Sequence, residues 1–226
     1  MNIVLLGAPA SGKGTQGGIL TNILNIPHIS SGNIIRQNIA DKTEIGLRVK
    51  DLISKGKLVD DQTTNAMVLD RLSKSDCNNG FILDGYPRTL SQAKTLDDAY
   101  KIDMAINIDV LEDVAVKRIS GRRVCNNCNK TYHISNLTSE ICPICNNPLV
   151  IRDDDKVEVI KERYKIFNEQ TKVLLDFYSE KGVLVTVDGN GTSDKTTQEI
   201  LEAIKKWANN DINQNRCGNW IVKNLR

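Results

Sequence analysis

Three observations predict that this 226-residue chain adopts an α/β fold with a doubly wound, parallel, five-stranded sheet. First, five short runs rich in Val, Ile and Leu are continuous rather than alternating, which is typical of strands covered by helices on both faces. Second, helical patterns separate these runs, as in β-α-β units. Third, a glycine-rich turn joins the first run to the first helix. The predicted strands span residues 3–6, 27–30, 81–83, 105–108 and 183–187.

The helical patterns between the runs complete the predicted fold. Thr89, followed three residues later by Gln92, matches a capping box, and Ser193 with Asp194 suits the start of the last helix. Gly17 and Gly18 interrupt the first helix, and each should cost about 1 kcal/mol relative to alanine. The predicted helices of the core span residues 13–24, 62–73, 91–100, 111–120, 156–179 and 193–208.

Two stretches depart from this alternation of strands and helices. Residues 30–59 hold two short helical patterns, 34–40 and 45–54, where a single crossover would suffice. Residues 122–163 hold paired cysteines, Asn, Pro and Asp in place of apolar periodicity. Both are predicted to be insertions in a core domain formed by residues 1–29, 60–121 and 164–226. No structure is predicted for the Asn-rich tail after Trp207.

Composition limits the classes of partner. The net charge of +2 is too small to predict non-specific binding to nucleic acid or membranes. The apolar run after Met1 is too short for a signal peptide, and no stretch approaches the roughly 20 apolar residues of a membrane span. We therefore expect a cytoplasmic protein that binds neither nucleic acid nor membranes. If it binds a polyanionic ligand, basic side chains clustered at the binding site must supply the positive charge.

The segment from Gly7 to Lys13 fits the pattern G-x-x-x-x-G-K, directly after the first strand and before the first helix. Glycines allow backbone N–H groups to turn toward phosphate oxygens, and the helix N-terminus adds partial positive charge. Lys13 would bridge the β- and γ-phosphates of a nucleoside triphosphate. The usual Ser or Thr after the lysine is replaced by Gly14, and Thr15 comes one position later.

Four of the six cysteines form two C-x-x-C pairs, Cys125 with Cys128 and Cys142 with Cys145. This spacing predicts a structural Zn²⁺ site, because four thiolates leave no open position on a tetrahedral ion. Two disulfides are the alternative, and His133 is a competing ligand. Cys77 and Cys217 are expected to be simple thiols.

The segment from Leu83 to Thr89, with Gln92 one turn later, leaves the end of a predicted strand, where α/β sheets place their ligands. Asp84 can hold the water shell of Mg²⁺, and Arg88 can bind a phosphate in bidentate fashion. This segment resembles the D-G-[FY]-P-R-T signature of adenylate kinases. Further segments are similar to other parts of that family, and the similarity runs from Asn2 to about Ile204. These segments are residues 30–36, 56–59, 121–123 and 152–154, together with Arg163.

The resemblance implies reversible, Mg²⁺-dependent phosphoryl transfer from ATP to AMP, giving two ADP, in a monomer. It makes residues 30–59 an AMP-binding insertion and residues 122–163 a zinc-binding lid. The implied ATP-binding residues are Gly7, Ala10, Ser11, Gly12, Lys13, Gly14, Thr15, Arg118, Arg122, Thr131, Tyr132 and Gly191. The implied AMP-binding residues are Ser31, Arg36, Lys57, Leu58, Val59, Gly85, Tyr86, Pro87, Arg88, Gln92, Arg152 and Arg163, with Gln92 reading the adenine edge. The implied catalytic residues are Lys13, Arg36, Asp84, Arg88, Arg118, Arg122, Arg152 and Arg163.

Elementary chemistry agrees with this assignment. Phosphoryl transfer needs positioning and charge neutralisation, and arginine remains charged and binds phosphate oxygens in pairs. No general base is expected, because the AMP phosphate is already an anionic nucleophile. Two departures from the family pattern are Ser31 for threonine and Asn33 for aspartate. The remaining alternatives are a kinase for GMP, CMP or UMP and a zinc-ribbon nucleic-acid-binding module fused to a nucleotide switch.

Overall fold

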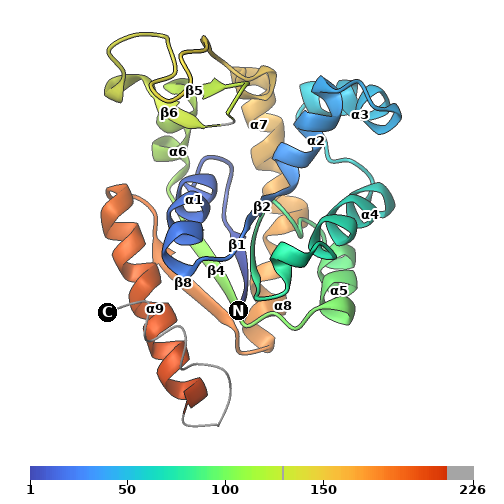
Figure 1. Ribbon diagram of the computed structural model, residues 1–226, viewed down its shortest axis with the longest axis vertical. Helices are drawn as coiled ribbons and strands as arrows, with labels where there is room; N and C mark the ends of the chain where they lie inside the picture. Colours follow the sequence, from blue (N-terminus) through green and yellow to red (C-terminus); the bar gives the residue numbers. More distant parts are fainter. Residues whose placement is uncertain (129, 213–226) are drawn as a thin grey trace.

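A five-stranded parallel sheet forms the centre of the computed structural model, which describes residues 1–128 and 130–212 (Figure 1). The strand order is β2-β3-β1-β4-β8. Every pairing is parallel, so all five strands end at the same edge of the sheet. The strands are β1 (Asn2–Leu6), β2 (His28–Ser30), β3 (Phe81–Asp84), β4 (Met104–Asp109) and β8 (Leu184–Asp188).

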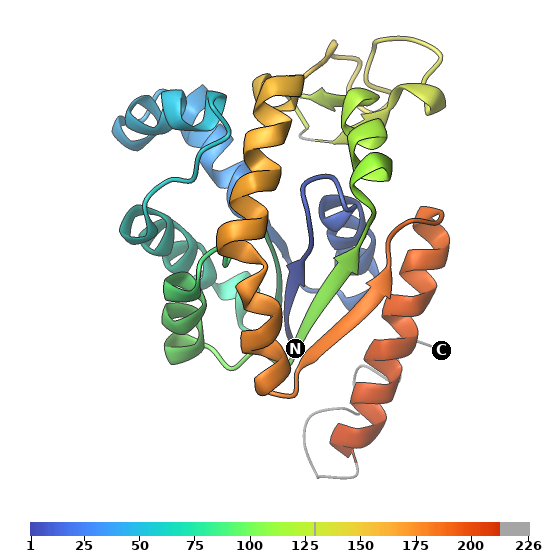
Figure 2. The same ribbon diagram turned by 180° about the vertical axis from the view of Figure 1, so that it is seen from behind.

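Helices cover both faces of this sheet (Figure 2). Ile3 and Leu5 of β1 pack with α1 (Lys13–Leu24) and α9 (Ser193–Ile212). Val4 and Leu6 point to the opposite face, which is covered by the helices α4 (Asp61–Leu72), α5 (Leu90–Ala99) and α8 (Val173–Glu180). Burial on both faces explains why the strands read as continuous apolar runs. The predicted doubly wound α/β fold is confirmed.

The predicted helix over residues 156–179 is wrong as a single element. It consists of α7 (Val157–Ile166), the π-helical turn η4 (Phe167–Thr171) and α8. The Lys172 N–H donates to the Phe167 carbonyl at 2.9 Å, five residues earlier, and this wider turn is invisible to a 3.6-residue periodicity.

The last helix continues past its predicted end at residue 208 to Ile212, and Ala208 is fully buried against the sheet. Its first turn is capped by Thr192, whose hydroxyl accepts the Lys195 N–H at 3.3 Å. The expectations for residues 213–226, including Cys217, lie outside the described residues. Thr89 caps α5 by accepting the Gln92 N–H at 3.2 Å, so half of the predicted capping box forms.

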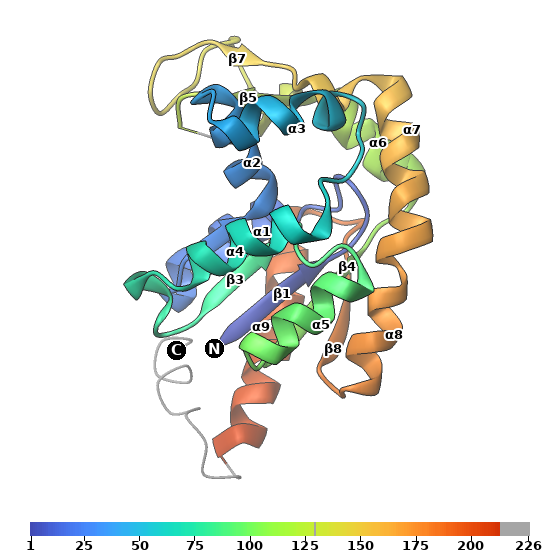
Figure 3. The ribbon, with the colours of Figure 1, turned by 90° about the vertical axis from the view of Figure 1, so that its right-hand side faces the viewer.

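Two groups of elements extend from the same end of the sheet (Figure 3). Between β2 and α4 lie α2 (Ser31–Ala40) and α3 (Glu44–Ser54), which share a small apolar cluster. After α6 (Glu112–Ser120) comes an antiparallel sheet in the order β6-β5-β7. Its strands are β5 (Arg122–Cys125), β6 (Thr131–His133) and β7 (Leu149–Val150). Three short 3₁₀ helices complete the described elements: η1 (Ser75–Cys77) before β3, η2 (Ile134–Asn136) after β6 and η3 (Asp153–Asp155) before α7.

Candidate functional site

A cavity of about 1230 Å³ lies where the carboxyl ends of the strands meet the two additional groups of elements. Its lining draws residues from the whole length of the described chain, from Leu5 to Thr196. The predicted site residues that line it are Gly7, Ala10, Ser11, Gly12, Lys13, Gly14, Thr15, Ser31, Arg36, Lys57, Leu58, Val59, Asp84, Gly85, Pro87, Arg88, Gln92, Arg118, Arg122, Cys128, Thr131, Tyr132, Arg152, Arg163 and Gly191.

Tyr86 is the predicted nucleotide-binding residue that the structure places elsewhere. Its side chain is fully buried in the hydrophobic core beneath the cavity. The hydroxyl donates to Asn65 Oδ1 at 2.8 Å and lies 3.2 Å from the Gln92 carbonyl oxygen. Gly85, which has a φ angle of +75°, and Pro87 lie on either side of Tyr86 in the chain and line the cavity, while the Tyr86 side chain faces inward.

The turn between β1 and α1 has the backbone geometry of an anion cradle. Gly7 and Gly12 have φ angles of +134° and +106°, which favour glycine, and a Cβ on Gly7 would lie 2.5 Å from the Ile108 carbonyl oxygen. Among the described residues, no side chain caps α1, and its first turn has no acidic residue. The free N–H groups and the helix dipole therefore favour an anion at this end.

Lys13 lies at the bottom of this cradle. Its ammonium donates to the carbonyl oxygens of Gly7 at 2.7 Å and Ala8 at 2.8 Å. Burial lowers the pKa of Lys13 to about 8; Asp84 opposes this shift, and Arg88 adds to it. The ammonium is thus held by neutral carbonyl groups in a site where an incoming phosphate would be a stronger partner.

Five of the six arginines that line the cavity, all except Arg118, come from different parts of the chain and lie close enough for their charges to repel one another. Burial lowers the pKa of Arg88 to about 10, and the charge of Arg163 adds to this shift. Burial likewise lowers the pKa of Arg152 to about 10, with contributions from Arg36 and Arg122. Arg88 and Arg152 therefore remain protonated at neutral pH. The cavity therefore carries concentrated positive charge, which suits a ligand with several negative charges.

Two acidic residues, Asp154 and Asp155, form ion pairs with arginines of this group. The sequence analysis gave neither residue a role. Asp155 has no exposed side-chain surface and forms ion pairs with Arg122 and, at 3.2 Å, with Arg163. Asp154 lies 3.0 Å from Arg163. The available signal was the run of acidic residues 153–155 directly after Arg152, in a segment predicted to bear phosphate-binding cations. These carboxylates fix the orientation of the guanidinium groups.

Three further residues that were predicted to bind nucleotide make hydrogen bonds within the protein. Arg36 donates to Asn33 Oδ1 at 2.6 Å, and Arg118 donates to the Gly191 carbonyl at 3.0 Å. Ser31 Oγ donates to the Gly85 carbonyl at 2.6 Å. The Asn33 amide therefore orients Arg36 although it lacks the charge of the aspartate in the family pattern.

Asp84 ends β3 beside His28, a cavity residue that sequence analysis missed. His28 Nε2 lies 3.6 Å from Asp84 Oδ2. Burial raises the pKa of Asp84, but the His28 and Lys13 side chains outweigh this effect, and the net shift is downward. An ionised carboxylate in a phosphate-binding cavity suits a hard cation such as Mg²⁺.

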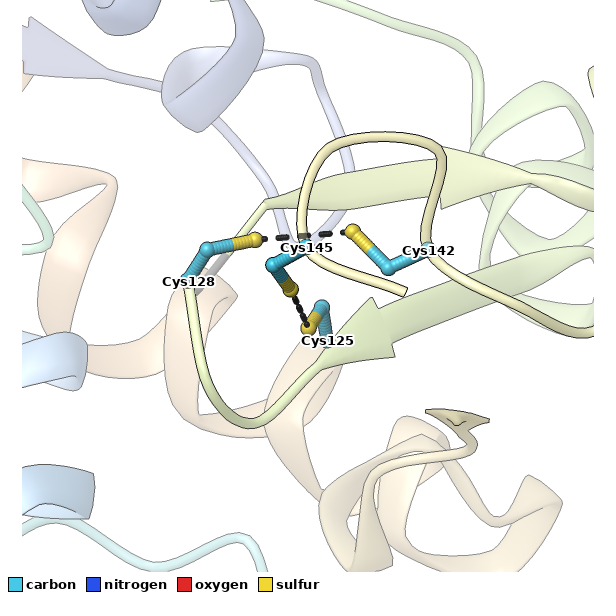
Figure 4. A group of neighbouring side chains, drawn as sticks. All are labelled: Cys125, Cys128, Cys142 and Cys145. Carbon is cyan, nitrogen blue, oxygen red and sulfur yellow. Dashed lines mark hydrogen bonds between the residues drawn. The ribbon is translucent and has the colours of Figure 1, made fainter. Parts of the chain in front are cut away.

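The four paired cysteines form one cluster in the β5–β7 region, with their sulfur atoms directed toward one another (Figure 4). All four sulfurs lie within 4.8 Å of one another. The Sγ atoms of Cys125 and Cys145 are 3.3 Å apart, and those of Cys128 and Cys142 are 3.6 Å apart. All four are free cysteines, so the disulfide alternative has no support in the structure.

This cluster fits zinc. Four sulfurs bound tetrahedrally at about 2.3 Å from Zn²⁺ lie about 3.8 Å from one another, close to the spacing found here. The backbone N–H of Asn147 lowers the pKa of Cys145 to about 6, which favours the thiolate form that metals bind. His133, the competing ligand, instead contacts Ser135 Oγ through Nδ1 at 2.7 Å.

A family model described as adenylate kinase matches residues 5–183. The chain belongs to the adenylate kinase family. Among curated relatives, the adenylate kinases of Finegoldia magna and Thermosipho melanesiensis are each 46% identical over 214 residues, covering 91% of this chain and all of the relative. That of Acetivibrio thermocellus is 46% identical over 212 residues, covering 90% of this chain and 98% of the relative.

Membership of the adenylate kinase family confirms the predicted resemblance and the assignment to the phosphotransferases. The cysteine cluster supports the expected zinc site. No helix within residues 1–128 and 130–212 is long and apolar enough to cross a membrane.

Proposed function

We propose that this protein transfers the γ-phosphoryl group of ATP to AMP, reversibly, to form two ADP. The observation that carries the proposal is a single cavity that joins the anion cradle before α1 to a group of partly buried arginines. Phosphoryl transfer needs an in-line arrangement and neutralisation of the transferring charge. The cationic side chains around this cavity would supply the neutralisation, and one cavity shared by both ligands would allow the alignment.

ATP would occupy the side of the cavity formed by the cradle and the β5–β7 segment. Lys13 and the N–H groups of α1 would hold its β- and γ-phosphates, and Arg118 and Arg122 would neutralise their charge. The proposed ATP-binding residues are Gly7, Ala10, Ser11, Gly12, Lys13, Gly14, Thr15, Arg118, Arg122, Thr131, Tyr132 and Gly191. The Tyr132 hydroxyl lies 3.3 Å from Cys142 Sγ, so any contact between Tyr132 and ATP would involve its ring or backbone.

AMP would lie between α2, α3 and the segment after β3. Arg36 and Arg88 would bind its phosphate, and Arg152 and Arg163 would approach the transferring group from the opposite side. The proposed AMP-binding residues are Ser31, Arg36, Lys57, Leu58, Val59, Gly85, Pro87, Arg88, Gln92, Arg152 and Arg163. The AMP phosphate is itself the nucleophile, so we assign no general base.

Two metal ions complete the proposal. Asp84 would position Mg²⁺ bound to ATP, and this ion would supply charge neutralisation on the phosphates. Zn²⁺ bound to the four cysteines would have a structural role. Residues 30–59 would be the AMP-binding segment and residues 122–163 the zinc-binding lid, inserted in a core of residues 1–29, 60–121 and 164–226. We propose a cytoplasmic monomer with no nucleic-acid or membrane partner.

A coupled assay of ADP formation from ATP with AMP, GMP, CMP or UMP tests the reaction. We expect AMP to have the highest kcat/KM, and a higher value for another base would overturn the assignment to AMP. Lys13→Ala and Arg88→Ala should each lower turnover by orders of magnitude. Lys94→Ala, at an exposed position of α5, is the matched control and should retain the wild-type rate.

A gel-shift assay at physiological salt separates the enzyme from the nucleic-acid-binding alternative. The net charge is only +2 and the clustered arginines line the cavity, so we expect no shift of RNA or DNA. A shift with an affinity comparable to that for ATP would favour the alternative.

A further inference from the structure

The side-chain amide of Gln92 is held at both ends by the protein. Its Nε2 donates to Asp61 Oδ1 at 2.8 Å, and its Oε1 accepts the Arg88 N–H at 2.7 Å. The side chain is buried, with 2% of the residue exposed, yet it lines the cavity. Asp61 lies on α4 and was given no role by the sequence analysis.

Asp61 is itself fixed by Thr89. The Thr89 hydroxyl donates its single hydrogen to Asp61 Oδ2 at 2.9 Å, and its oxygen accepts the Gln92 N–H at 3.2 Å. The cap of α5, the carboxylate of α4 and the Gln92 amide therefore form one closed set of hydrogen bonds. Each donor in this set faces an acceptor.

This arrangement permits one orientation of the Gln92 amide. If the amide were rotated by 180°, Oε1 would face the Asp61 carboxylate and Nε2 would face the Arg88 N–H. Both contacts would be repulsive, and both groups would lose their partners. In the observed orientation, the amide retains one free N–H on Nε2 and one free lone pair on Oε1 for a ligand.

We propose that Asp61 is a positioning residue that sets the base specificity of the acceptor site by holding the Gln92 amide in this orientation. The inference rests on the proposed function, in which Gln92 faces the base of the nucleoside monophosphate. One donor beside one acceptor matches adenine, which presents its N6 amino donor next to a ring-nitrogen acceptor. A 6-oxopurine reverses this pattern at its Watson–Crick edge, with the O6 acceptor next to the N1–H donor.

The test compares AMP with inosine monophosphate, which differs from AMP at this edge of the base. The quantity measured is the ratio of kcat/KM for AMP to kcat/KM for inosine monophosphate. Asp61→Ala removes one of the two contacts that fix the amide and leaves the Arg88 N–H as the other, so the rotated orientation becomes accessible. The ratio should then fall by about tenfold, a conservative value for one bidentate base contact. Asp61→Asn keeps an acceptor for Nε2 and should retain a ratio near that of the wild type.

Asn65→Ala is the control for a purely structural effect. Asn65 lies one turn along α4 and contacts Tyr86 and Thr95, not Gln92. This variant should lower the melting temperature without changing the ratio. An unchanged ratio in Asp61→Ala, with altered stability or KM alone, would overturn the inference. Asp61→Ser replaces Asp61→Ala if the latter does not fold.

The two proposals fail separately. If the wild type forms no ADP from ATP and AMP, the proposed function fails whatever the variants do. If the wild type strongly prefers AMP and all Asp61 variants keep that preference, only the role of Asp61 fails.

Discussion

At the scale of single residues, the positive charges that line the cavity repel one another when no anionic ligand is bound. Lys13 and the five arginines are surrounded by protein, and their neighbours carry the same charge. Asp84, Asp154 and Asp155 offset part of this repulsion. The cationic groups that would bind phosphate are thus already in position before the substrate enters.

Lys13 should give this site a measurable pH dependence. Its pKa is lowered to about 8, so the ammonium of the free enzyme is lost as the pH rises through that value. Because the charged form binds phosphate, kcat/KM for ATP should decrease above about pH 8, whereas kcat should decrease less, since bound phosphates favour the ammonium. Lys13→Arg, which remains charged, should lack this decrease in kcat/KM. A wild-type profile that is flat to pH 9.5 would contradict the assignment.

Which residues could be predicted from sequence depended on whether their role is local. Lys13, Arg88 and the four paired cysteines belong to short motifs. In the structure, Lys13 and Arg88 line one cavity, and the four cysteines form one cluster. Asp61 was missed because its partners, Thr89 and Gln92, belong to the cap and first turn of another helix, 28 and 31 positions away, and no local pattern marks such a contact. Tyr86 was predicted to bind AMP because it lies within a motif, although its side chain packs in the core.

At the scale of elements, the two adjacent glycines of α1 differ in the space available for a side chain. A Cβ on Gly17 would lie 2.4 Å from His28 Nε2, whereas a Cβ on Gly18 would meet nothing within 4 Å. Gly17 thus makes room for the ring that contacts Asp84, and Gly18 is a position where alanine fits.

These two glycines form a matched pair for mutation. Gly18→Ala should raise the free energy of unfolding by about 1 kcal/mol, the usual gain in helix propensity. Gly17→Ala makes the same local change but must displace His28, so it should be less stable than Gly18→Ala. Urea denaturation of both variants gives the comparison, and equal stabilisation by both would contradict the packing argument.

The β5–β7 element depends on its cysteines because its apolar core is small. Cys125, Cys142 and Leu149 are its buried members, with a few partly buried residues around them. A metal bound by four thiolates would supply the missing stability. Cys142→Ser should therefore reduce bound zinc and lower the melting temperature more than it lowers kcat. Cys77→Ser, a buried cysteine outside the cluster, should keep the metal. Full zinc content in Cys142→Ser, by atomic emission, would argue against the site.

Elements with strong periodicity were predicted to within a few residues. Burial on two faces made the five strands continuous, and α1 matches its predicted bounds. The π-helical turn η4 was missed because its backbone bonding leaves no trace in hydrophobic spacing. It lies beside the site: Thr171 donates from η4 to the Arg88 carbonyl at 3.0 Å.

At the scale of the whole molecule, the α2–α3 segment and the β5–β7 segment extend from the same end of the central sheet (Figure 3). Both contribute residues to the lining of the cavity. Gly56, which follows α3, packs against Val159 and Arg163 of α7. The two segments together can exclude water from transferring phosphate.

Water exclusion predicts that ATP alone is a poor substrate. Without AMP, the arginines of the acceptor side lack their anion and the reacting phosphate has no nucleophile other than water. ATP hydrolysis should be slower than ADP formation with AMP by orders of magnitude. Phosphate release, measured with and without AMP, checks this. Rapid hydrolysis of ATP alone would contradict the proposed role of the two segments.

The crowding of arginines in one cavity also affects how this protein should be handled at the bench. Any small polyanion in the solution, whether pyrophosphate, citrate or the buffer itself, is a potential counterion for these guanidinium groups, and a solute that binds only the native state raises its apparent stability. A melting curve recorded in phosphate buffer would then contain a contribution from ionic occupancy of the cavity, whereas one recorded in an amine buffer with chloride would reflect the polypeptide more directly.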